Sequence, residues 1–428
     1  MSKYLLSYFL HNKNVHSLTN NVVIAIFGLI NFLILTQSLS QEQLGQWAIF
    51  LAGTTLLERV RSGLMQSALI NYTVGIEKSE QRKYYSAAWW LGLLITLLVI
   101  IVVEIISYFL SKTPDFVSFK AFFLFFSITY LATYPAFHAY WQKITEQKFL
   151  ELLLLRFITF GFFFLFLLSH YFYFHFSVEK IGWGYVVGHT LSSIVALFLG
   201  WCDWRFWTII PINKIKELFN FGKYSLGSQL SEHLLKSIDS FMLGYFLSPV
   251  AVAIYQVPNK IVEGFEILIR SFGINLHSQL SLSFKNEQMD SFREVLFQYI
   301  RNLTLFFLLI ALILIPLSSW VVVWLAGEGY KSSASILKIF LVFYLLMPFF
   351  KFTDIGLDAC WKPHIIYIKT FSMLIINIIG NYIAIRFFHS IEGVAFVSVL
   401  VYGLGAFVSW AVLGKIMPLS FKKMLNLS

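Results

Sequence analysis

The sequence has little charge for its length. Of its 428 residues, only 13% are Asp, Glu, Lys or Arg, whereas 58% are hydrophobic and 18% are aromatic. Soluble proteins contain about 25% charged residues, so a chain of this size could not cover its core with a hydrated surface. This scarcity excludes a soluble protein, and we expect the apolar surface to face lipid. The sequence therefore predicts an integral membrane protein.

Cysteine and the common catalytic motifs are also scarce. The chain has two cysteines, Cys202 and Cys360, which have neither metal-site spacing nor the number needed for a disulfide framework. It has no P-loop and no HExxH motif, which excludes the ATP hydrolysis and zinc chemistry of those motifs. We therefore expect no metal site and no cofactor. The net charge of +10 does not indicate nucleic acid, because the basic residues mostly lie in short connections, where they mark membrane topology.

Apolar stretches long enough to cross about 30 Å of hydrocarbon occur along the whole chain. They predict twelve transmembrane helices, near residues 21–39, 45–74, 85–110, 117–141, 150–174, 181–201, 223–247, 250–277, 295–325, 332–355, 363–388 and 393–416. No connection is long enough to hold a soluble domain. The predicted fold is an all-α membrane protein with two six-helix lobes around a central cavity.

The longest connection lies in the middle of the chain and mixes aromatic with basic residues. It contains Trp204, Phe206 and Trp207 beside Lys214 and Lys216, a composition typical of an amphipathic helix at a membrane surface. We therefore predict an N-terminal lobe over residues 1–201, an amphipathic cytoplasmic linker over 202–222, and a C-terminal lobe over 223–428.

The two predicted lobes partly repeat each other. A shift of 208 places Leu39 and Ser40 on Leu247 and Ser248, and Glu58 on Glu266. Such similarity also arises by chance between apolar helices. If it is genuine, it predicts parallel repeats related by an axis along the membrane normal.

Basic residues predict the orientation of the bundle. Lys and Arg gather at both ends of the chain and in the even-numbered connections. The odd-numbered connections hold only Lys112, Lys120, Lys180, Lys331 and Arg386. Because positive connections stay inside, both termini are predicted to be cytoplasmic. Both cysteines then lie on the cytoplasmic side, where thiols stay reduced.

Several short motifs occur in a fixed order. Residues 39–47 form a Gly-containing turn that ends in Trp, and residues 58–64 read Glu-Arg-Val-Arg-Ser-Gly-Leu. Further motifs lie at 221–255, 315–317, 324–334, 381 and 393–395. Together they resemble the pattern of Wzx-type O-antigen and polysaccharide flippases, in the multidrug/oligosaccharidyl-lipid/polysaccharide (MOP) exporter superfamily. The second helix of this chain is more charged than the family pattern.

The resemblance implies both a site and a substrate. It implies a cavity lined mainly by helices 1, 2, 7 and 8, and a substrate of undecaprenyl-pyrophosphate-linked oligosaccharide. The bilayer is then the bacterial inner membrane. Glycosyltransferases and a polysaccharide polymerase are the partners that such a flippase would meet.

Charged residues inside the spans concentrate in predicted helices 2, 7 and 8, and most share a helix face at 100° per residue. Such residues cost about 2.5–3.5 kcal/mol each on insertion scales and usually face a cavity or a partner. The cations that we expect to bind a pyrophosphate head group are Arg61, Lys236, Lys260, Arg270 and, across its helix, Arg59. The acidic residues that would pair with them or carry a coupling proton or sodium ion are Glu58, Glu232, Asp239, Glu263 and Glu266.

Two interpretations of these charges stay open. Arg suits phosphate because its planar fork donates two parallel hydrogen bonds. Alternatively, the pairs Glu58–Arg61, Glu232–Lys236 and Glu266–Arg270 only hold helices together.

Three functions are compatible with a membrane protein of this kind. The first is a lipid-linked oligosaccharide flippase that works by alternating access. The second is a drug or organic-cation antiporter of the same superfamily, whose cavity should be negative. The third is a membrane enzyme of polysaccharide assembly. Asp354 and Asp358 could form a carboxylate pair for such an enzyme, but no loop is long enough to assemble a site around them. We therefore expect a transporter and not an enzyme.

Overall fold

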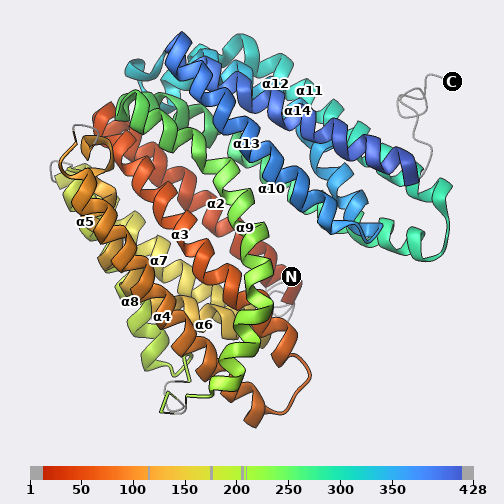
Figure 1. Cartoon of the computed structure of the whole chain (residues 1–428). Coiled ribbons are helices and arrows are strands. Elements are labelled where there is room, and N and C mark those ends of the chain that lie inside the picture. The colour runs from red at the N-terminus through yellow and green to blue at the C-terminus, as the bar shows by residue number, and fades with distance from the viewer. Residues whose placement is uncertain (1–12, 114–115, 174–176, 204–206, 209, 417–428) are drawn as a thin grey trace, which may run out of the picture. The chain divides into compact units, whose positions relative to one another are not determined.

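A computed structural model describes residues 13–113, 116–173, 177–203, 207–208 and 210–416 (Figure 1). These residues form helices joined by short turns, and no strand occurs among them. The predicted all-α fold is therefore confirmed. The chain divides into two compact units, Met1–His233 and Leu234–Ser428, which matches the expectation of two lobes.

The helices follow one another along the chain with few interruptions. Those of the first half are α2 (Lys13–Ser38), α3 (Gln41–Thr73), α4 (Lys78–Leu110), α5 (Phe116–Ala132), α6 (Tyr134–Thr145), α7 (Phe149–Tyr173) and α8 (Val178–Phe198). Those of the second half are α9 (Ile212–Phe246), α10 (Pro249–Lys285), α11 (Met289–Ala326), α12 (Ser333–Ala359), α13 (Pro363–Phe388) and α14 (Ile391–Ile416).

Each predicted span coincides with one helix, except the fourth. That span consists of α5 and α6, which are bent by 49° at their junction. Seven described helices, and the bent pair taken as one span, are long and apolar enough to cross a membrane. Helices α3, α9 and α10, which carry the predicted site charges, do not belong to this set. The count of twelve spans stays a prediction.

The predicted linker is partly continuous with the seventh span. Helix α9 begins at Ile212 and runs to Phe246, so the second half of the linker is the first part of a long helix. Trp204 and Phe206, part of the predicted amphipathic pattern, lie outside the described residues. The division between the units falls within α9, and the lobe limits at 201 and 223 stay a prediction.

In the first unit, α2 packs against α7, α3 packs against α5 and α4, and α8 packs against α7, α5 and α6. Its core is aromatic: the ring of Trp47 lies 4.9 Å from Phe50 and 5.5 Å from Tyr185. The first part of α9 lies against α3, because a Cβ added to Gly222 would stand only 2.1 Å from the carbonyl oxygen of Leu64. This contact requires glycine.

In the second unit, α12 contacts α10, α11 and α14, while α13 packs mainly against α14. Outward-facing side chains of α11 and α13 include Leu309, Leu312, Ile313 and Ile379, all more than half exposed. Exposed apolar side chains of this kind suit a lipid environment.

The sequence repeat has a structural counterpart at two helix starts. Ser40 precedes α3 and its hydroxyl accepts a hydrogen bond from the backbone N–H of Gln43, while Ser248 precedes α10 and does the same for Ala251. Each satisfies a backbone donor that the helix itself leaves free. Helices α3 and α10 therefore begin alike.

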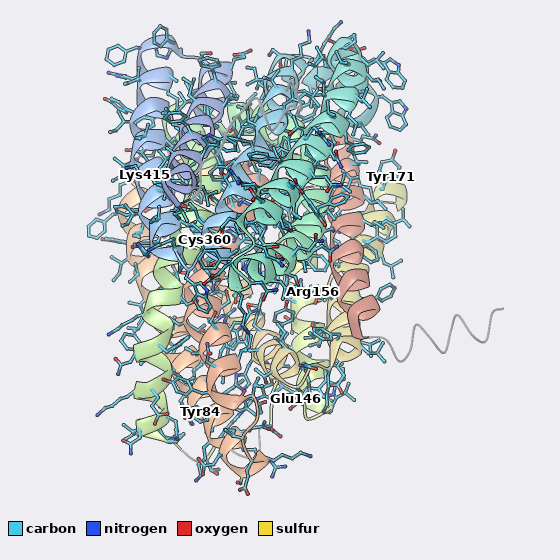
Figure 2. The ribbon with its side chains drawn as sticks, turned by 90° about the vertical axis from the view of Figure 1, so that its right-hand side faces the viewer. Tyr84, Glu146, Arg156, Tyr171, Cys360 and Lys415 are labelled. Carbon is cyan, nitrogen blue, oxygen red and sulfur yellow. The ribbon has the colours of Figure 1, made fainter. Side chains whose placement is uncertain are left out.

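The connections whose basic residues predict a cytoplasmic location lie together at one end of the first unit. The hydroxyls of Tyr85 and Thr145 lie 2.8 Å apart, and Tyr84 donates a hydrogen bond of 2.5 Å to Glu217. Figure 2 shows Tyr84 and Glu146 at the same end of this unit. The start of α4, the end of α6 and the start of α9 therefore share one side, as the predicted topology requires.

Candidate functional site

Three of the predicted site residues form a charge network in the second unit. The Lys236 ammonium of α9 lies 3.1 Å from a carboxylate oxygen of Glu266 in α10, and a guanidinium nitrogen of Arg270 lies 2.9 Å from the same oxygen. Glu266 thus bridges two cations. The Lys236 side chain is 28% exposed and that of Arg270 is 72% exposed, so both remain accessible to a ligand.

A second pair lies on the same helix. The Lys260 ammonium is 2.5 Å from Glu263, and both side chains are partly exposed. Lys351 of α12, which was not among the sequence-predicted candidates, also interacts electrostatically with Glu266. This part of the second unit therefore holds the cations Lys236, Lys260, Arg270 and Lys351 against the carboxylates Glu263 and Glu266.

Arg61 lies in a different environment. Its side chain is completely buried, and its carboxylate partner Glu58 is 13% exposed. All five N–H groups of the guanidinium have partners. The Nε and one Nη2 N–H donate to Glu58; the others donate to Thr96 Oγ1 at 3.2 Å, the Tyr130 carbonyl oxygen at 3.0 Å and Thr133 Oγ1 at 2.9 Å. The guanidinium also lies 4.3 Å from the centre of the Tyr130 ring.

Arg59 and Glu232 are the remaining candidates. Arg59 is half-buried on α3 and acts electrostatically on Glu58, and Glu232 is exposed on α9. Helices 1, 2, 7 and 8 belong to two separate units, and the cavity that they would share stays a prediction.

Asp239 of α9 is buried in a ring of neutral hydrogen-bond donors. It accepts from Asn381 at 2.7 Å, from Ser398 at 2.9 Å and from the hydroxyl of Tyr255. Asn377 donates to it as well. Among the described residues, no Lys, Arg or His forms an ion pair with Asp239, and the buried Oδ1 of Asn381 has no hydrogen-bond partner. The ring therefore combines an uncompensated carboxylate with a free amide oxygen.

Lys369 of α13 is a buried cation that was not among the sequence-predicted candidates. Its ammonium pairs with Asp354, donates to Ser409 at 2.9 Å, and lies 4.2 Å from the centre of the Phe350 ring. Ser409 in turn donates to Asp354 at 2.6 Å. Asp358 lies 3.1 Å from His277. The two aspartates thus have separate partners.

Both cysteines are buried. Burial raises the pKa of Cys202 to about 12 and that of Cys360 to about 11. Because the thiolate is the metal ligand and nucleophile, neither thiol suits that chemistry at neutral pH. Among the described residues, no group of three His, Cys, Asp or Glu side chains could hold a metal ion.

Some functional candidates were visible in the sequence as single polar residues within apolar spans. Asn377 and Asn381 lie four residues apart, and therefore share one face of α13. Lys369 precedes them in the same helix. A search restricted to clusters of charge misses these residues because their partners, Asp239 and Asp354, lie on other helices.

Sequence comparison identifies the family. The profile of the polysaccharide biosynthesis protein family matches residues 12–273, which is more than half of the chain, and the MatE profile matches residues 225–383. The chain therefore belongs to the polysaccharide biosynthesis protein family. No curated protein matches it significantly.

Solved structures show the same fold. The lipid II flippase MurJ, in an inward closed conformation, superposes with a TM-score of 0.78 at 15% identity, over 97% of this chain and 90% of that chain. An inward-facing multidrug resistance MATE family transporter of the MOP superfamily gives 0.75 at 13% identity, over 91% and 93%. A MOP superfamily transporter from Pyrococcus furiosus, with a binding pocket described as having reverse polarity, gives 0.64 at 14% identity, over 94% and 93%. The fold is that of the MOP superfamily transporters.

Proposed function

We propose that the protein is a flippase for undecaprenyl-pyrophosphate-linked oligosaccharide, the unit of an O-antigen or another surface polysaccharide. It would move this lipid outward across the bacterial inner membrane by alternating access. The observation that carries the proposal is the accessible cationic network of Lys236 and Arg270 around Glu266, in α9 and α10. Membership of the polysaccharide biosynthesis protein family supports it.

The charge of the substrate explains why such cations are needed. A pyrophosphate carries about two negative charges, which hydrocarbon strongly disfavours. A protein that moves it must offer compensating cations at membrane depth, facing water and not lipid. Arg270 and Lys236 are partly exposed and share one carboxylate. A diphosphate could therefore compete with Glu266 for both cations, and the fork of Arg270 offers bidentate contacts.

The alternative functions have less support. An antiporter of organic cations should have a negative site, whereas Lys236, Lys260, Arg270 and Lys351 outnumber Glu263 and Glu266 in this part of the second unit. For a membrane enzyme, the best carboxylate pair consists of Asp354 and Asp358, which bind different partners.

We further propose that Asp239 is the coupling site. A buried carboxylate without a cation is costly unless it binds a positive ion or a proton. Sodium prefers oxygen ligands, and the carboxylate of Asp239, the free Oδ1 of Asn381 and the hydroxyl of Ser398 offer three. A sodium ion or a proton bound here would stabilise one arrangement of α9, α13 and α14. Glu58, Glu263 and Glu266 pair with cations and are weaker candidates for this role.

Deletion of the gene tests the proposed function in the cell. The flippase account predicts that lipid-linked glycan accumulates on the cytoplasmic leaflet and that a surface polysaccharide disappears. Glycosyltransferases would supply the substrate and a polymerase would consume it, so both activities should remain in extracts of the deletion strain. Unchanged surface glycan together with accumulation of toxic cations would support the antiporter instead.

A further inference from the structure

The fourth predicted span is interrupted at Thr133, between α5 and α6. Pro135, in the first turn of α6, has no N–H to donate to the helical ladder. The backbone groups that the break leaves free must find other partners, because hydrocarbon offers none. They are satisfied by side chains from three other parts of the first unit.

Ser193 of α8 bridges the gap itself. Its hydroxyl donates to the carbonyl of Ala132 at 2.5 Å and accepts from the backbone N–H of Ala136 at 3.2 Å. In an unbroken helix, the N–H of Ala136 would donate directly to Ala132. The serine hydroxyl is therefore inserted into one rung of the ladder, a recognised cause of helix kinks. The thiol of Cys202 donates to the carbonyl of Pro135 at 3.2 Å.

Arg61 of α3 occupies the carbonyl end of α5. It donates to the Tyr130 carbonyl and to the Thr133 hydroxyl, and that hydroxyl also donates to the Tyr130 carbonyl at 3.1 Å. The end of a helix carries partial negative charge, which favours a cation. Glu58 accepts hydrogen bonds from Nε and Nη2 of the same guanidinium. The guanidinium N–H groups of Arg61 that could bind a phosphate therefore already have partners within the protein.

We propose that Arg61 is a positioning residue of the broken span, and not a ligand of the head group. It fixes the end of α5 to α3, while Ser193 keeps the rung between Ala132 and Ala136 open. Together they maintain the angle of 49° between α5 and α6 as the protein transports. This assignment differs from the sequence-based expectation for Arg61, and its kinetic test rests on the proposed transport function.

Kinetic measurements separate the two roles. The protein is reconstituted in proteoliposomes with lipid-linked oligosaccharide extracted from the deletion strain, and outward movement is measured against lipid concentration. Arg61→Lys and Thr133→Val should lower the turnover number about tenfold or more while KM changes less than about twofold. Thr159→Val, which removes a buried hydroxyl bonded to the Leu155 carbonyl elsewhere in the unit, is the matched control and should change neither value. A rise of KM in Arg61→Lys, as large as that in Arg270→Gln, would overturn the proposal.

A distance measurement tests the same proposal without transport. Spin labels are placed on Leu124→Cys in α5 and Lys148→Cys beyond α6, both at exposed positions. The buried native thiols should not react. Arg61→Gln and Ser193→Ala should shift or broaden the distance distribution, whereas Arg270→Gln and Thr159→Val should leave it unchanged. An unaltered distribution in both Arg61→Gln and Ser193→Ala would contradict the positioning role, even if the proposed substrate proves wrong.

Discussion

At the scale of single residues, two similar charge pairs have different environments in the two units. Glu58–Arg61 in α3 and Glu266–Arg270 in α10 both join residues of one helix, three and four positions apart. The first arginine is fully buried and the second is 72% exposed. A buried pair is strongly destabilising to break, by about 3–5 kcal/mol, because it leaves an unpaired charge. An exposed pair contributes at most about 1 kcal/mol, so Arg270 is freer to exchange partners.

Substitution of Arg270 therefore tests whether this residue binds the head group. Arg270→Ala should reduce export severalfold while the protein inserts and melts normally, because its pair with Glu266 adds little stability. Arg270→Lys should restore only part of the activity, since the charge returns without the bidentate fork. Export of surface glycan, normalised to protein in the membrane, measures both effects.

The double variant with Glu266→Ala distinguishes binding from pairing. If the pair of Glu266 and Arg270 is purely structural, removal of both partners should recover what either single change loses. If Arg270 binds the head group, the double variant should not recover export.

Substitution of Asp239 tests whether this residue couples transport to a sodium or proton gradient. Asp239→Asn keeps the shape of the side chain but removes the charge that attracts an ion. It should abolish the dependence of transport on a sodium or proton gradient, whereas Glu263→Gln should leave that dependence intact. Transport in proteoliposomes with imposed gradients measures it. Wild-type dependence retained in Asp239→Asn would place the coupling site elsewhere.

At the scale of elements, the sequence predicts where helices lie better than how they meet. Each predicted span coincides with a helix, or with the α5–α6 pair, because long apolar runs leave few alternatives in a membrane. The break at Thr133 was not predicted, since proline is tolerated within spanning helices. Apart from Glu58, the partners of Arg61 were also not predicted. Thr96, Tyr130 and Thr133 lie 35, 69 and 72 residues from it, beyond any helical period.

Gly222 lies within one of the sequence motifs, but the sequence alone does not predict that this residue contacts α3. Gly222 approaches the backbone of Leu64 so closely that an added Cβ would lie 2.1 Å from its carbonyl oxygen. Gly222→Ala should therefore push the helices apart and lower the free energy of unfolding by about 1–3 kcal/mol. Gly264→Ala in α10 is the control, because nothing lies within 4 Å of its added Cβ. Thermal melting of the purified variants in detergent measures the difference, and equal stability of the two variants would contradict the close contact.

At the scale of the whole molecule, the distribution of basic residues predicts cytoplasmic termini. The two ends of α4 test this orientation, because Ser79 and Lys112 are both exposed and lie near its opposite ends. In intact cells, a membrane-impermeant maleimide should label Lys112→Cys but not Ser79→Cys until the membrane is opened. The native thiols should stay silent, since burial raises the pKa of Cys202 to about 12 and that of Cys360 to about 11. If only Ser79→Cys is labelled in intact cells, the orientation is the opposite of the predicted one.

The central claim is that cations on α9 and α10 carry a pyrophosphate-linked glycan across the bilayer. The most direct measurement is the movement of purified lipid-linked oligosaccharide between leaflets of proteoliposomes that contain the wild type, Lys236→Gln, Arg270→Gln or the control Lys83→Gln. Lys83 is a half-exposed lysine paired with Glu80 in the first unit. The account predicts that the wild type and Lys83→Gln move the lipid, while Lys236→Gln and Arg270→Gln show a KM raised about tenfold or more. Equal transport by all four proteins, or none by the wild type, would contradict it.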